Sequence, residues 1–182
     1  MGVVPTEGRG DLPTASLGGR SLVALASAAL SQAGVVQISR NMSWTSVQDM
    51  AVPVVLHDPL CPLTPASTLT DALGAADAGH VVVGYRPVTD TIKSVTAGRV
   101  GQTVRREHLL GIASPVVLPA SVVAALDAWP DTSDVAAMVT MLRARFAVRF
   151  VEVPPRGGRV EDPSALLLLE AYAELHPDLG QT

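Results

Sequence analysis

The sequence has 182 residues, of which 48% are hydrophobic and 16% charged, and it carries a net charge of −4 at pH 7. This length and apolar content suit one α/β domain with a buried core and argue against a disordered chain. The acidic balance argues against a general nucleic-acid binder, because that role needs a basic face. The only cysteine, Cys61, excludes an internal disulfide framework and fits a reducing cytoplasm.

The N-terminus shows no apolar run behind a basic start, so we expect no signal peptide. The longest apolar stretch, residues 21–36, is interrupted by Ser27, Ser31, Gln32 and Gly34. It is too short and too polar to span a bilayer. The sequence therefore predicts a soluble, cytoplasmic protein without a membrane or nucleic-acid partner.

Apolar periodicity divides the chain into alternating strands and helices. Short β-branched runs predict strands at residues 3–5, 35–38, 52–56, 81–83 and 148–153. Apolar residues recurring every three or four positions predict helices at residues 21–33, 64–79, 120–128, 134–145 and 162–175. The polar stretches 6–19 and 41–49 are expected to be loops. Strands alternating with helices indicate a mostly parallel sheet, with function at the carboxyl ends of the strands.

Capping residues mark several of these helix ends. Ser21 is expected to cap the first helix, which Gly34 ends. Thr64 is expected to cap the second, with proline at its first position. Thr132 or Ser133 is expected to cap the helix at 134–145. Between the strand at 81–83 and the helix at 120–128, residues 87–114 have few long apolar runs and predict an extended arm.

Four stretches, taken in order, resemble the 2-C-methyl-D-erythritol 4-phosphate cytidylyltransferase family. They are Val3–Pro5 with Leu17–Leu22, His57–Pro62, Pro87–Lys93 and Arg159–Pro163. The heptapeptide Pro-Val-Thr-Asp-Thr-Ile-Lys at 87–93 is the most specific of them. The resemblance implies one domain over residues 1–182 with a three-layer, Rossmann-like nucleotidyltransferase (GT-A-like) fold. It also implies that residues 87–114 form a protruding β-arm that reaches over the partner in a homodimer.

The phosphate loop departs from the family pattern, P-A-A-G-x-G-x-R followed by Pro-Lys. In the family this loop holds the triphosphate on backbone N–H groups, and its Arg and Lys neutralise charge at the α-phosphate. Here Gly8, Arg9 and Gly10 remain as a degenerate phosphate loop, with Arg9 out of register for the family arginine. Thr14 follows proline where the lysine belongs. Two acidic residues, Glu7 and Asp11, add negative charge near the expected phosphates.

The base-binding part of the site is also reduced. Only residues 39–53 replace the longer family segment that recognises cytosine, with Ser46 and Val47 as its remnant. Cys61 stands where the family has an arginine, and Arg156 where it has an acidic residue. We therefore expect nucleotide binding to be impaired, and Mg²⁺ to be a cofactor only if a nucleotide binds. The spacing of His, Cys and carboxylates contains no separate metal site.

The side of the site that faces the phosphorylated polyol is better retained. Serine replaces the usual threonine at two positions and arginine replaces lysine at one, so each change keeps a hydroxyl or a positive charge, although Arg and Lys differ in geometry. The resemblance thus implies substrate-binding roles for Asp58, Thr91, Arg106, Ser114, Ser133 and Arg159. Arg159 is also the one family-matched catalytic candidate.

Simpler interpretations stay open for most of these residues. Gly8 and Gly10 also suit an ordinary loop. His57 and Asp58 also suit the plain end of a strand, and Arg106 a solvated arm. Cys61 is better explained as a small buried hydrophobe than as a nucleophile.

Two functions from different classes follow. The favoured one is a non-catalytic dimeric homologue that keeps a pocket for a phosphate or polyol phosphate. The alternative is an active nucleotidyltransferase that joins CTP, or another nucleoside triphosphate, to 2-C-methyl-D-erythritol 4-phosphate or a related sugar phosphate in isoprenoid precursor synthesis.

Overall fold

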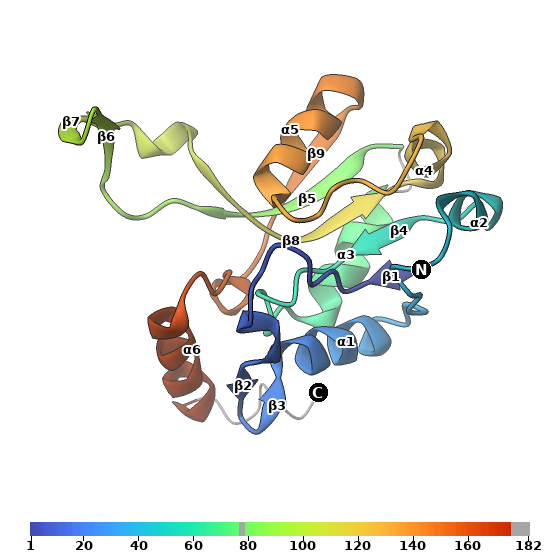
Figure 1. Cartoon of the computed structure of the whole chain (residues 1–182), viewed down its shortest axis with the longest axis horizontal. Helices are drawn as coiled ribbons and strands as arrows, with labels where there is room; N and C mark the ends of the chain where they lie inside the picture. The colour runs from blue at the N-terminus through green and yellow to red at the C-terminus, as the bar shows by residue number, and fades with distance from the viewer. Residues whose placement is uncertain (77–78, 176–182) are drawn as a thin grey trace.

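The structure is a computed structural model that describes residues 1–76 and 79–175 (Figure 1). Its centre is a five-stranded sheet in the spatial order β1-β4-β8-β5-β9. The bounds are β1 Gly2–Val3, β4 Val54–Leu56, β8 Leu110–Leu118, β5 Val81–Pro87 and β9 Val148–Glu152. Strand β1 is parallel to β4 and β5 is parallel to β9, whereas β8 runs antiparallel to both of its neighbours. The predicted mostly parallel sheet is confirmed, with β8 as the reversed strand.

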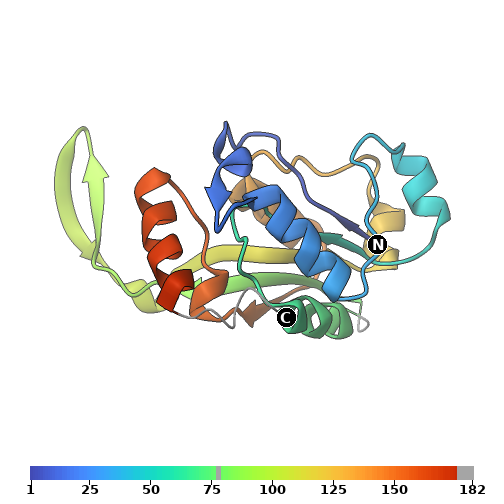
Figure 2. The same ribbon diagram turned by 90° about the horizontal axis from the view of Figure 1, so that it is seen from below.

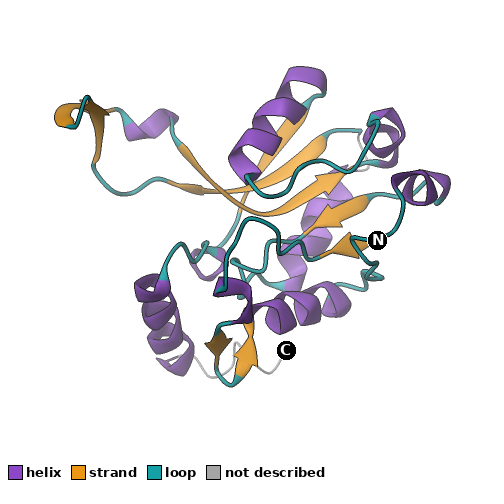
Figure 3. Ribbon diagram, in the orientation of Figure 1, coloured by secondary structure: helices purple, strands orange, loops and turns teal. Residues whose placement is uncertain are grey.

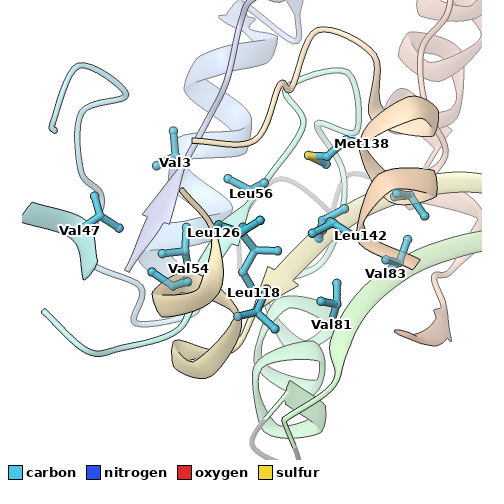
Figure 4. Packing of buried hydrophobic residues seen from close by; sticks show 14 of the residues in the cluster. Val3, Val47, Val54, Leu56, Val81, Val83, Leu118, Leu126, Met138 and Leu142 are labelled. Carbon is cyan, nitrogen blue, oxygen red and sulfur yellow. The ribbon is translucent and has the colours of Figure 1, made fainter. Parts of the chain in front are cut away.

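Helices cover both faces of this sheet and give the three predicted layers (Figure 3). Helices α1 (Leu22–Gln32) and α3 (Ala66–Ala76) cover one face. Helices α2 (Trp44–Asp49), α4 (Ala120–Ala125) and α5 (Val135–Arg145) cover the other. Successive side chains of a strand point to opposite faces, so Val54 and Leu56 pack beneath the second group while Val55 packs beneath the first. Figure 4 shows the aliphatic cluster of the second face.

Helix α2 lies within residues 41–49, where the sequence predicted a loop. Ser43 caps the helix, because its hydroxyl accepts a hydrogen bond from the backbone N–H of Ser46. Trp44 and Val47, three residues apart, are both buried. The Trp44 indole donates to the Leu126 carbonyl at 2.7 Å and its ring lies 4.8 Å from that of Trp129. The prediction was wrong because packing stabilises a helix too short to show periodicity.

Other predicted boundaries shift for local reasons. Residues 35–38 form only an isolated bridge, Gly2 with Gln37, because β1 offers two residues for pairing. Asp134 caps α5, where Thr132 or Ser133 was predicted, by accepting from the Ala137 N–H at 2.9 Å. The Thr64 hydroxyl donates to the Cys61 carbonyl and α3 begins at Ala66, so Thr64 is not its cap.

Residues 6–19, predicted as one loop, contain two short elements. The 3-10 helix η1 (Leu12–Thr14) precedes β2 (Ser16–Leu17), which pairs with β3 (Arg20–Ser21). Leu17 at the end of β2 is buried against Leu22 and Leu60. Helix α6 (Pro163–Leu175) packs Leu166 and Leu169 on this cluster.

The arm projects from one end of the molecule (Figures 1 and 2). Its hairpin consists of β6 (Ile92–Thr96) and β7 (Arg99–Val104) and is followed by η2 (Arg106–His108). Strands β5 and β8 lead into and out of it, so residues 110–114 already lie in the central sheet. Within the described part of the chain, no helix is long and apolar enough to cross a membrane.

Candidate functional site

Asp58 lies directly after β4, at the carboxyl ends of β1 and β4. The backbone N–H of His57 donates to the Val3 carbonyl, which extends the pairing with β1 to this point. The Asp58 N–H donates to Ser114 Oγ at 3.0 Å, and the Leu60 N–H donates to Asp58 Oδ1 at 3.0 Å. These bonds fix the carboxylate at the edge of the sheet, where an α/β fold places its ligands.

Two arginines from distant parts of the chain hold this carboxylate. Arg9 Nε lies 2.7 Å from Asp58 Oδ1, and Arg159 Nε lies 3.3 Å from Oδ2. The exposed side-chain fractions are 1% for Arg9, 8% for Asp58 and 31% for Arg159. Burial alone would raise the pKa of Asp58, but the hydrogen bond and charge of Arg9, the Leu60 N–H and the charge of Arg159 lower it on balance. Asp58 is therefore an anion whose oxygens already have donors.

Glycines on both sides of Arg9 turn its side chain inward. Gly8 and Gly10 have φ angles of +75° and +55°, a region that side chains other than glycine rarely adopt. A Cβ atom at Gly8 would lie 2.7 Å from the backbone of Ser133, so glycine is also required there for the close approach of the two loops. The Arg9 guanidinium in addition donates to the Glu7 carbonyl. The two glycines thus shape a loop that buries its own arginine.

A neutral polar pair lies beneath Asp58. His57 is fully buried, and its Nδ1 lies 2.5 Å from Ser114 Oγ. Burial lowers the pKa of His57 to about 4, partly opposed by the charge of Asp58. Burial, together with Asp58, raises the pKa of the Cys61 thiol to about 12. The histidine is therefore neutral at pH 7, and Cys61 is a thiol buried as a small hydrophobe, poorly suited to act as a nucleophile.

The cavity beside these residues is small. It has a volume of about 20 Å³, lined by Arg9, Asp58, Ser114 and Arg159 together with aliphatic side chains. Thr132 also lines it, and its buried hydroxyl has no hydrogen-bond partner within the described residues. That volume holds about one water molecule. Arg9 fills the space beside the carboxylate.

Thr132 was not among the predicted site residues. A binding role was expected for its neighbour Ser133, whose Oγ instead donates to Asp131 Oδ1 at 2.7 Å on the surface. The signal was present, because the two hydroxyl residues are adjacent and either could face inward. Only the packing of the loop against Gly8 decides which of them does.

The structure therefore brings Arg9, Asp58, Ser114 and Arg159 together and leaves the arm residues apart. Thr91 and Arg106 are exposed, and Arg106 donates to the Thr89 carbonyl. Neither lines the cavity. Across the described ranges, no three His, Cys, Asp or Glu side chains are grouped so that they could hold a metal ion.

Comparisons with known proteins agree with this architecture. The chain is 31% identical over 135 residues to the bifunctional enzyme IspD/IspF of Caulobacter vibrioides, which covers 72% of the chain and 34% of that enzyme. It is 34% identical over 131 residues to the 2-C-methyl-D-erythritol 4-phosphate cytidylyltransferase of Frankia casuarinae, covering 69% of the chain and 48% of that protein. The chain thus spans a third to a half of the curated relatives it matches. No family model matches the chain.

Solved structures show the same fold. The 2-C-methyl-D-erythritol 4-phosphate cytidylyltransferase of Thermus thermophilus superposes with a TM-score of 0.71 at 22% identity, over 96% of this chain and 98% of that one. The corresponding enzyme of Francisella tularensis superposes with a TM-score of 0.63 at 15% identity, over 96% and 97% of the two chains. Sequence and fold together make the chain a divergent relative of the 2-C-methyl-D-erythritol 4-phosphate cytidylyltransferase family.

Proposed function

We propose that the chain is a non-catalytic, dimeric homologue of the cytidylyltransferases and that it does not bind a nucleotide. One observation carries the proposal: Arg9, the only cation of the degenerate phosphate loop, is 1% exposed and neutralised by Asp58. A guanidinium in that position cannot also face a triphosphate. The loop is left with two exposed acids, Glu7 and Asp11, of which Glu7 lies 3.9 Å from Arg40. No cation of the loop itself offsets the charge of Asp11 toward a triphosphate.

The absence of the loop cations would have a large effect on the rate of the family reaction. Removing one donor to a transition state costs about 2.7–4 kcal/mol, or roughly 10²–10³ in rate. Here the loop lysine is replaced by Thr14, whose hydroxyl donates to the Asp11 carbonyl, and the loop arginine is turned inward. Catalysis by the family mechanism would therefore lack both loop cations.

The side of the site that would bind a polyol phosphate is less altered. Arg159 keeps 31% of its side chain exposed while it holds Asp58, so it can still reach an anion in solvent. Ser114 stays buried beside the carboxylate. In a dimer, Thr91 and Arg106 on the arm of the second subunit would complete this pocket. The binding function that we assign to the chain is therefore the binding of a phosphate or polyol phosphate at Arg159.

Titration calorimetry with CTP and Mg²⁺ tests the proposal. We expect no heat of binding up to millimolar CTP, because the loop presents no cation to the phosphates. A catalytically competent family member measured beside it serves as the positive control. Micromolar CTP binding, or release of pyrophosphate on addition of 2-C-methyl-D-erythritol 4-phosphate, would establish the alternative, an active nucleotidyltransferase.

The dimer is tested at the arm. The β6–β7 hairpin exposes 66% of Val95 and 73% of Val100, two apolar side chains that a partner would cover. We expect sedimentation velocity to show a dimer for the wild type and a monomer for the double variant Val95→Asp, Val100→Asp, because a subunit interface does not tolerate two buried carboxylates. Val36→Asp, at a residue 74% exposed outside the arm, should stay dimeric. A dimeric arm variant would place the interface elsewhere.

A further inference from the structure

A second cavity lies away from the Asp58 site, between α1 and the start of α3. Its volume is about 560 Å³, and no residue that the structure describes lines both cavities. Four segments form its walls: β3, one face of α1, the loop from Pro62 into α3, and the 3-10 helix η3 (Pro155–Gly157). The size falls within the range of small-molecule sites, about 300–1,000 Å³.

Small residues leave this space open. The α1 residues that line it, Leu25, Ala28, Ala29 and Gln32, have the i, i+3, i+4, i+7 spacing of a single helix face. The alanines on that face keep the helix surface low beneath the groove. Leu63 and the prolines of the adjoining loop add apolar surface on the other wall. The floor of the groove is therefore apolar, and an apolar ligand body would be desolvated there.

Among the described residues, the charged lining of this groove is basic. Arg20 and Arg156 line it, and none of the described residues that line it is acidic. The Arg20 guanidinium donates to the Ala24 carbonyl at 3.2 Å, which holds the side chain along α1. Arg156 makes no hydrogen bond or ion pair with any other residue the structure describes. One cation is thus positioned by the fold and the other is available to a ligand.

The hydroxyl and backbone groups of the groove also favour a negatively charged ligand. Thr64 and Ser67 line it at the N-terminal end of α3, and the Thr64 hydroxyl is directed to the Cys61 carbonyl, away from the helix N–H groups. The positive end of an eleven-residue helix therefore adds to the field of the two arginines.

We propose that this groove binds an organic anion with an apolar body and a phosphate or carboxylate head. The head would lie between Arg20 and Arg156, and the body along the alanine face of α1. This site is independent of nucleotide binding and of the Asp58 cluster, so it can be present whether or not the proposed function holds.

Hexyl phosphate is a suitable probe, because it joins a short apolar chain to one phosphate. We expect calorimetry on the full chain to give one bound molecule per chain, with affinity at least tenfold weaker in Arg156→Gln and in Arg20→Gln, because a charge-assisted bond to phosphate is lost in each. Ala28→Trp should abolish binding by filling the groove. Hexyl glucoside, which has the same apolar chain and no charge, should not bind at the same concentrations.

Arg99→Gln, which removes an exposed arginine of the arm, is the matched control and should bind hexyl phosphate like the wild type. Circular dichroism establishes that each variant is folded. The proposal is overturned if the wild type shows no binding at millimolar hexyl phosphate. It is equally overturned if Arg20→Gln and Arg156→Gln weaken binding no more than Arg99→Gln does.

Discussion

Replacing Arg9 by methionine should destabilise the fold by about 3 kcal/mol, because it leaves the Asp58 carboxylate buried without its main partner. The Arg9 Nε–Asp58 Oδ1 distance is 2.7 Å, and the two side chains are 1% and 8% exposed. Arg159 and the Leu60 N–H remain as donors, which keeps the loss at the lower end of the range for broken buried pairs. For a domain of this size the change corresponds to a fall in Tm of roughly 6–12 °C. Thermal unfolding followed by circular dichroism measures it.

The double variant Arg9→Met, Asp58→Asn separates the effect of the unpaired buried charge from the effect of altered side-chain packing. Methionine approximates the length of the arginine stem, and asparagine removes the unpaired charge while keeping an oxygen for the Leu60 N–H. We expect the double variant to be more stable than Arg9→Met alone. Arg105→Met, at a side chain 82% exposed on the arm, is the matched control and should change Tm little. An equal fall in Tm in Arg9→Met and in Arg105→Met would mean that Arg9 does not hold Asp58 in solution.

The layered core was predictable from the sequence because it follows from periodicity. In β4 and β5, consecutive apolar residues alternate between the two faces of the sheet, and both faces are covered by helices. Such continuous β-branched runs identify buried strands without any knowledge of their partners. The helix caps were less predictable, because several hydroxyl or carboxyl residues in a row can each serve, as Asp134 does after Thr132 and Ser133.

The interior of the site was not predictable, because it is made by contacts between distant residues. Arg9 and Asp58 are 49 positions apart, and Asp58 and Arg159 are 101 apart. The family resemblance assigned Arg9 to a degenerate phosphate loop, together with the glycines on either side of it. Their positive φ angles instead direct the arginine toward β4. Asp58, Ser114 and Arg159, three of the residues to which the resemblance assigned a binding role, lie in contact in the structure. The direction of the Arg9 side chain could be known only from the packed loop.

Stability should fall by about 3 kcal/mol between pH 6.5 and pH 4, because the fold excludes a proton that the unfolded chain accepts. The pKa of His57 is lowered by burial from 6.5 to about 4. Well above pH 6.5 the histidine is neutral in both the folded and the unfolded chain, and the full stability is present. Between pH 6.5 and pH 4 the unfolded chain gains the proton while folded His57 stays neutral, and each pKa unit is worth about 1.4 kcal/mol. Urea unfolding at pH 7.5, 6, 5 and 4.5 measures the slope.

His57→Asn identifies the group responsible. An asparagine amide can still meet Ser114 Oγ, but it does not titrate, so the variant should lose most of the slope between pH 6.5 and pH 4. His80→Asn leaves His57 in place and should retain it. Asp58 affects stability in a different pH range. Its pKa is lowered in the folded chain, so its contribution to folding stability is lost only as the pH falls below about 4. A slope that persists in His57→Asn would show that protonation at another site opens the fold, and His57 would then not be the buried neutral base beneath Asp58.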